Sequence, residues 1–185
     1  MSGKAKGENG MADKEALARA LWASGALSPG PEDRPLVWNG GAALNNEDLR
    51  AALLDALEEL ARDHYAAARA VLGGPWAEAL ARRLELPLNP RVLPERILAV
   101  EEAVSDGEEL LALARPIRAA GASIAAAALF NFGLESARRR LDLADVRLHW
   151  LTDLETAAAV ALQDGLLDFD DYDRLMAYQG SDGQD

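Results

Sequence analysis

The sequence contains no cysteine and only two histidines, His64 and His149. The absence of cysteine excludes disulfide bonds, thiolate catalysis and metal sites with cysteine ligands. The acids at residues 168–173 lack the glycine and glutamate spacing of a calcium loop, so we interpret them as helix-capping residues. We therefore expect no metal site. For His149 we favour a hydrogen-bonded structural role over that of a proton carrier.

Long apolar runs are also missing, and lysine is scarce. No run could cross a bilayer, and the first ten residues lack the apolar stretch of a signal peptide. Lys4, Lys6 and Lys14 are the only lysines, in a chain whose net charge is −12. A nucleic-acid backbone is a poor partner for such a chain, because binding it requires lysine and arginine to displace counterions. We expect a cytoplasmic protein that binds neither membranes nor nucleic acid, and we interpret the three arginines at 138–140 as a solvated helix end.

The length of 185 residues suits a single domain. Residues 1–11 are rich in glycine, lysine, serine and asparagine and show no periodic apolar pattern, which predicts a disordered tail. Residues 12–185 then form the domain.

The most informative stretch is residues 97–109. Residues 97–100 are all apolar, which is typical of a parallel strand buried on both faces. After two acids and a turn, apolar residues recur at helical spacing until Gly121. A helix that begins at the carboxyl end of such a strand offers unpaired N–H groups to an anion. This turn is therefore the predicted functional site.

Strands and helices alternate along the rest of the chain, which predicts an α/β fold with a parallel sheet covered on both faces. Asp13 and the pair Asn45-Asn46 are candidate N-caps for the first two helices. The helices expected are 13–24, 47–62, 75–84, 110–120, 134–141, 153–163 and 170–178, and the strands are 35–38, 66–72, 97–100, 122–132 and 146–150. Loops are expected at 27–34 and 89–95.

The central stretch resembles the type I phosphoribosyltransferases, and within them the orotate phosphoribosyltransferases. Their pattern has four apolar residues, Glu-Asp, two apolar residues and Ser/Thr-Thr-Gly-Gly-Ser/Thr, with which residues 97–109 align without a gap. The resemblance covers residues 12–179, most strongly in the C-terminal half. It implies the type I phosphoribosyltransferase fold, a Rossmann-like parallel sheet flanked by helices, here with a reduced N-terminal hood around residues 38–41.

The resemblance also implies a site for phosphoribosyl pyrophosphate, with two carboxylates on the ribose hydroxyls, backbone N–H groups around the 5′-phosphate, Mg²⁺, and lysines on a mobile loop. The positions that match its binding motif are Glu101, Glu102, Ser105, Asp106, Gly107, Glu108 and Glu109, and those that match its pyrophosphate loop are Leu72, Gly73 and Gly74. We interpret both sets as vestigial, with no catalytic residue set intact.

Several departures from the family pattern support this interpretation. Asp106 replaces a threonine, Glu108 a glycine, and Glu109 a serine or threonine. A carboxylate about 5 Å from a phosphate repels it by roughly 3 kcal/mol per charge pair at an effective dielectric constant near 20, before screening by salt. The mobile loop is reduced to residues 89–95, without lysine, and the hood is shortened after Gly41.

The same turn residues also suit a helix start without a ligand. Ser105 and Glu108 have the spacing of a capping box, and Asp106 and Glu109 repeat it. The leading hypothesis is a non-catalytic phosphoribosyltransferase-like protein with a regulatory or structural role and no cofactor. The alternative is an orotate phosphoribosyltransferase with weak or altered activity toward a pyrimidine base, which would use Mg²⁺. In both cases the resemblance implies a dimer, with itself or with a catalytic relative.

Overall fold

A parallel sheet in the order β3-β4-β5-β6 forms the centre of the computed structural model, which describes residues 6–31 and 35–181. The strands are β3 (Ala70–Gly73), β4 (Arg96–Val104), β5 (Ser123–Asn131) and β6 (Arg147–Asp153). β4 lies inside the sheet, with Ala99 opposite Leu72 of β3 and Ala126 of β5. The predicted α/β fold with an internal strand at residues 97–100 is confirmed.

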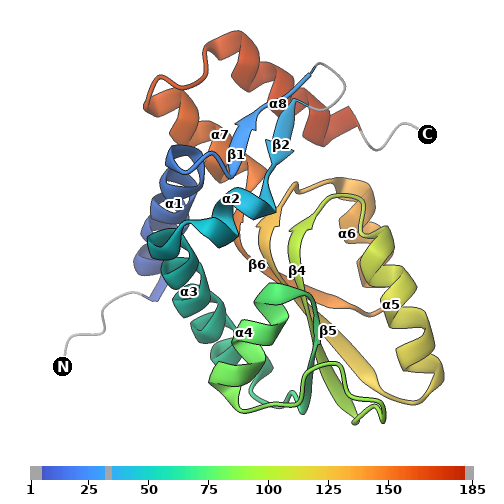
Figure 1. Cartoon of the computed structure of the whole chain (residues 1–185). Coiled ribbons are helices and arrows are strands. Elements are labelled where there is room, and N and C mark those ends of the chain that lie inside the picture. Colours follow the sequence, from blue (N-terminus) through green and yellow to red (C-terminus); the bar gives the residue numbers. More distant parts are fainter. Residues whose placement is uncertain (1–5, 32–34, 182–185) are drawn as a thin grey trace.

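Helices cover both faces of this sheet (Figure 1). One face packs against α1 (Lys6–Ala23), α3 (Glu47–Tyr65), α4 (Pro75–Leu84) and α7 (Leu154–Gln163), and the other packs against α5 (Glu108–Ala119) and α6 (Glu135–Leu143). Within β4, Leu98 and Val100 belong to the first core and Ile97 and Ala99 to the second. Both faces of the strand are therefore buried, which is why its apolar run is continuous rather than alternating.

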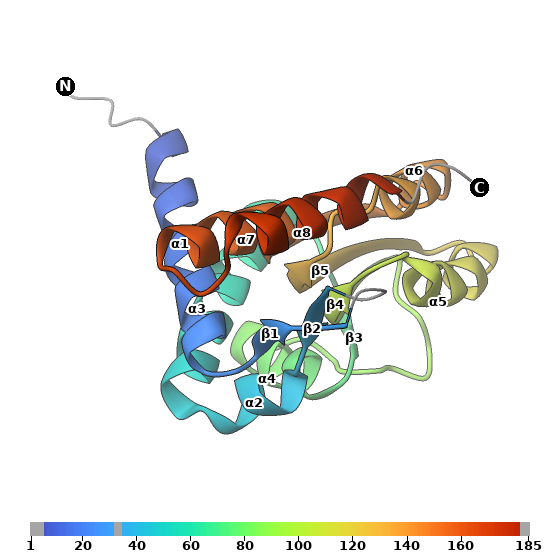
Figure 2. The same ribbon diagram turned by 90° about the horizontal axis from the view of Figure 1, so that it is seen from above.

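The N-terminal hood, defined here as β1 (Leu27–Pro29), β2 (Leu36–Trp38) and α2 (Gly40–Asn45), lies at the carboxyl ends of the strands. Figure 2 shows it there together with α8 (Phe169–Ser181). The loop predicted over residues 27–34 was wrong for 27–29, because β1 pairs with β2 in antiparallel register. The buried side chains of Leu27 and Leu36 stabilise this pair despite the proline in β1. Among the described helices, none is long and apolar enough to span a bilayer.

Two element boundaries differ from the prediction at alanine-rich or polar segments. Helix α3 continues to Tyr65 and β3 begins only at Ala70, whereas a strand was predicted from residue 66. Alanine has low strand propensity, so the alanines at 66–68 do not extend the sheet. Helix α1 begins at Lys6, before the predicted cap at Asp13 and within the predicted tail at residues 1–11. Residues 1–5 of that predicted tail lie outside the described residues.

Of the predicted pair Asn45-Asn46, Asn46 is the N-cap of α3, and it gives a direct stability test. The Asn46 side chain accepts a hydrogen bond from the Leu49 N–H at 3.0 Å. Asn46→Ala is expected to lower the free energy of unfolding by about 0.5–2 kcal/mol, because the helix loses this bond. Asn45→Ala is the matched control, since no described residue bonds its side chain, and it is expected to stay within about 0.5 kcal/mol of wild type. Urea denaturation of both variants measures the difference, and equal effects would contradict the capping role.

Candidate functional site

The acid pair lies inside β4 rather than in the turn after it, because the strand continues to Val104. Burial raises the pKa of Glu101, and the negative charges of Glu109 and Glu102 raise it further. Glu102 Oε2 accepts a hydrogen bond from Trp38 Nε1 of the hood at 3.4 Å. A Cβ at Gly40 would overlap this carboxylate, so a larger residue there would push the Glu102 side chain aside. The hood therefore holds the second carboxylate of the pair.

The turn between β4 and α5 places a carboxylate where the family's pattern places a phosphate. Asp106 Oδ1 accepts a hydrogen bond from the Glu108 N–H at 3.0 Å. Gly107, with φ +75°, is the N-cap of α5, and no side chain caps the helix from that position. The left-handed backbone of Gly107 explains why glycine is kept at this point of the turn.

The predicted capping boxes were wrong. Because α5 begins at Glu108, this residue occupies the first helical position and not the third, so its side chain cannot reach back to Ser105. Its Oε1 instead accepts a bond from Arg140 Nη1 of α6 at 2.9 Å. The turn residues were also expected to bond the free N–H groups at the start of α5, and among them only Asp106 does so, through the Glu108 N–H.

The segment that matches the pyrophosphate loop is bonded by a neighbouring side chain. Asn89 Oδ1 accepts from the Gly73 N–H and Asn89 Nδ2 donates to the Gly73 carbonyl, both at 3.1 Å. Gly73 has φ +138°, and a Cβ there would lie 2.5 Å from the Val100 carbonyl oxygen, so only glycine fits. Leu72 is buried, and Gly74 is the N-cap of α4. The role of Asn89 could not be predicted from the sequence, because no pattern in residues 89–95 indicates that this side chain bonds Gly73.

Cations are scarce around these elements. Residues 89–95 contain no helix or strand, and Arg91 on this segment is exposed. Of the lysines, only Lys14 lies in the part of the chain whose side chains are described, and its Nζ is 3.3 Å from Asp153 Oδ2. Within the described residues, no group of three or more histidine, cysteine, aspartate or glutamate residues could hold a metal ion.

The two histidines meet at the opposite, amino end of the sheet. His64 and His149 stack with ring centroids 3.9 Å apart, and His149 Nδ1 lies 2.6 Å from Tyr65 Oη. Tyr65 also donates to the Ala126 carbonyl, and burial raises its pKa to about 12. His149 is thus hydrogen-bonded, as the preferred interpretation required.

His149 should make stability depend on pH. Burial lowers the pKa of His149, and the charges of His64 and Arg147 lower it further. The unfolded chain, with a histidine pKa near 6.5, therefore binds a proton first as the pH falls. The contribution of His149 to the free energy of unfolding is therefore complete above about pH 6.5. It is lost as the pH falls toward the lower pKa that His149 has in the folded protein. We expect the urea midpoint to drop more between about pH 7.5 and pH 5.5 in wild type than in His149→Gln. The same drop in both proteins would exclude this role.

No family model matches the chain. The crystal structure of adenine phosphoribosyltransferase from Rhodothermus marinus superposes with a TM-score of 0.55 at 17% identity, covering 75% of this chain and 98% of that one. Orotate phosphoribosyltransferase from Aeropyrum pernix superposes with a TM-score of 0.68 at 25% identity, covering 80% and 99%. The chain therefore has the type I phosphoribosyltransferase fold.

Relatives in sequence show which type I phosphoribosyltransferases the chain resembles. The chain is 27% identical over 184 residues to orotate phosphoribosyltransferase of Bacillus caldolyticus, covering 82% of this chain and 89% of the relative. The resemblance to the orotate phosphoribosyltransferases within the type I family is confirmed.

Proposed function

We propose that this chain is a non-catalytic relative of the orotate phosphoribosyltransferases, with a regulatory or structural role. The observation that carries the proposal is the Asp106 carboxylate, which bonds the helix N–H of Glu108 at the turn where the family binds the 5′-phosphate. A ligand phosphate would have to displace this carboxylate. It would also meet the negative charges of Glu108 and Glu109 in the first turn of α5.

The hydrogen bonds of Asn89 and the raised pKa of Glu101 also support the loss of substrate binding. Asn89 already bonds the N–H and the carbonyl of Gly73, so this backbone is less available to a pyrophosphate. The raised pKa of Glu101 reflects burial and surrounding carboxylates, and more negative charge would add to that repulsion. These residues fit a Mg²⁺-bound polyphosphate poorly, because the guanidinium at the turn, that of Arg140, is already paired with Glu108 and no lysine lies on residues 89–95.

The second candidate is an orotate phosphoribosyltransferase with weak or altered activity. Glu101 and Glu102 remain adjacent on β4, and Gly107 retains the left-handed turn that the family's motif requires. If the chain is active, Mg²⁺ would accompany the substrate. The name of the relatives supports a pyrimidine base as the acceptor.

The proposal includes a dimer, with a second copy or with a catalytic relative whose activity the chain modulates. Trp76 is 2% exposed and belongs to the core, so its ring is not available to a partner. Large apolar side chains that remain exposed are Val92, Leu143, Leu166 and Phe169. The dimer therefore rests on these side chains and on the resemblance. Light scattering tests it, and a mass near 20 kDa that is unchanged by a catalytic relative would contradict it.

A turnover assay separates the two candidates. The full chain is incubated with Mg²⁺, phosphoribosyl pyrophosphate and orotate, and loss of orotate absorbance is followed beside an active orotate phosphoribosyltransferase. We expect a rate equal to that without protein. A rate above background that disappears in Glu101→Gln would instead establish the weakly active enzyme.

A further inference from the structure

A cavity of about 540 Å³ lies between α6 and the edge strand β6, and its lining includes no residue of the turn that matches the phosphate site. Its volume is within the range of small-molecule sites, and it reaches the carboxyl ends of β5 and β6, where open α/β sheets bind ligands. Figure 2 shows α8 extending toward α6, and Gln179 of α8 lines the cavity and bonds the loop before α6.

Two side-chain amides in this cavity are anchored on one residue, Gly133. Asn131, which is 8% exposed, accepts from the Gly133 N–H through Oδ1 at 3.0 Å. Gln179 donates from Nε2 to the Gly133 carbonyl at 3.2 Å. The other amide atoms, Asn131 Nδ2 and Gln179 Oε1, have no partner among the described residues. Neither atom is fully buried. The cavity is therefore lined by residues that hold one unused donor and one unused acceptor, to which a ligand can bond.

The rest of the lining selects against anions. An apolar wall is formed by Leu134, Leu141, Val146, Leu148 and Trp150. Four carboxylates line the cavity, from Glu135, Asp142, Asp153 and Glu155, against the guanidinium of Arg138 and the Lys14 ammonium that pairs with Asp153. A phosphate or carboxylate ligand would be repelled, whereas a neutral planar molecule can pack beside the Trp150 indole.

We propose that this cavity binds a neutral, planar heterocycle with a cyclic amide edge, whose carbonyl accepts from Asn131 Nδ2 and whose N–H donates to Gln179 Oε1. A single amide edge then bonds both the unused donor and the unused acceptor, while the ring lies against the apolar wall. This site is independent of the non-catalytic proposal, because none of the phosphate-turn residues lines it.

The test uses 2-quinolinone as the probe and nuclear magnetic resonance of the full chain. The indole N–H signal of Trp150, identified by its loss in Trp150→Phe, reports on the cavity. We expect a saturable shift with a Kd below about 1 mM, the affinity range of a probe of this size. N-methyl-2-quinolinone, which lacks the N–H, and quinoline-2-carboxylate, which is an anion, are expected to bind at least about tenfold more weakly.

Two variants test the residues. Asn131→Asp keeps the oxygen that bonds Gly133 but replaces the free donor, and Gln179→Ala removes the acceptor from an outer helix. Each is expected to weaken 2-quinolinone binding at least about tenfold. Gln163→Ala, a glutamine outside the cavity, is the matched control and should bind as wild type. No saturable shift of the Trp150 signal, equal binding of the three probes, or unchanged binding in Gln179→Ala would overturn the proposal.

Discussion

Restoring the family's turn, by Asp106→Thr, Glu108→Gly and Glu109→Thr together, is expected to create phosphate binding. Asp106→Thr frees the Glu108 N–H from its 3.0 Å bond to the carboxylate. Glu108→Gly releases Arg140, which now pairs with Glu108 and lies near the same turn. Removing three negative charges, each worth up to roughly 3 kcal/mol before screening, should outweigh the small cost to the start of α5.

Ribose 5-phosphate is the suitable ligand for this test, because it carries the 5′-phosphate without the pyrophosphate. We expect calorimetry to give a Kd at least about 100-fold lower for the triple variant than for wild type. The control has Glu59→Gln, Asp63→Asn and Asp170→Asn, which changes the net charge equally at exposed positions. If the control gains as much affinity as the turn variant, the gain reflects overall charge and not the turn.

The largest expected change in stability is that of Phe130→Ala. Phe130 is fully buried in β5, stacks on Trp38 of the hood at 5.8 Å and contacts Phe132 edge-on at 5.1 Å between ring centroids. Replacing its ring with a methyl group should lower the free energy of unfolding by about 3–5 kcal/mol, because the site loses apolar burial and leaves a cavity. The two ring contacts, worth about 0.5–1.5 kcal/mol each, are lost with it.

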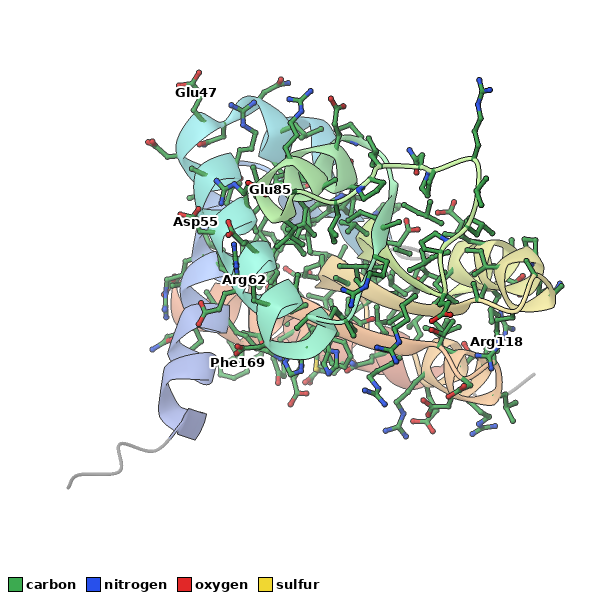
Figure 3. The ribbon with its side chains drawn as sticks, turned by 90° about the horizontal axis from the view of Figure 1, so that it is seen from below. Glu47, Asp55, Arg62, Glu85, Arg118 and Phe169 are labelled. Atoms are coloured by element: carbon green, nitrogen blue, oxygen red, sulfur yellow. The ribbon has the colours of Figure 1, made fainter. Side chains whose placement is uncertain are left out.

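Urea denaturation of Phe130→Ala measures this loss, with Phe169→Ala as the matched control. Phe169 is 73% exposed at the start of α8, and Figure 3 shows it far from Arg118 on the opposite side of the molecule. The control is expected to stay within about 0.5 kcal/mol of wild type. A loss below about 1 kcal/mol in Phe130→Ala would show that the hood and the sheet do not share one core.

The sheet could be predicted from local sequence patterns, because burial of a strand on both faces requires a continuous run of apolar residues. The apolar run at residues 97–100 is buried on both faces of β4, and Asn46 caps α3 because the cap needs only a neighbour three residues on. The β1–β2 pair and the start of β3 were missed because strand pairing depends on distant residues and not on the propensity of residues 27–29 or 66–72.

The position of the candidate site could be predicted from the sequence, but the hydrogen bonds of its residues could not. The aligned motif located the turn, whereas the bond from Trp38 to Glu102 joins residues 64 positions apart. The bonds of Asn89 to Gly73 likewise depend on the fold of the loop. The capping-box predictions failed because α5 starts at Glu108, two residues later than the Ser105–Glu108 box requires and one later than the Asp106–Glu109 box requires.

The most direct test of a non-catalytic site is calorimetric titration of the wild-type chain with phosphoribosyl pyrophosphate in the presence of Mg²⁺. With Asp106 on the helix N–H and Asn89 on Gly73, we expect no saturable heat up to a ligand concentration of about 5 mM. An active orotate phosphoribosyltransferase titrated in the same buffer verifies the ligand. Saturable binding by the wild-type chain with a Kd below about 1 mM would contradict the loss of the substrate site.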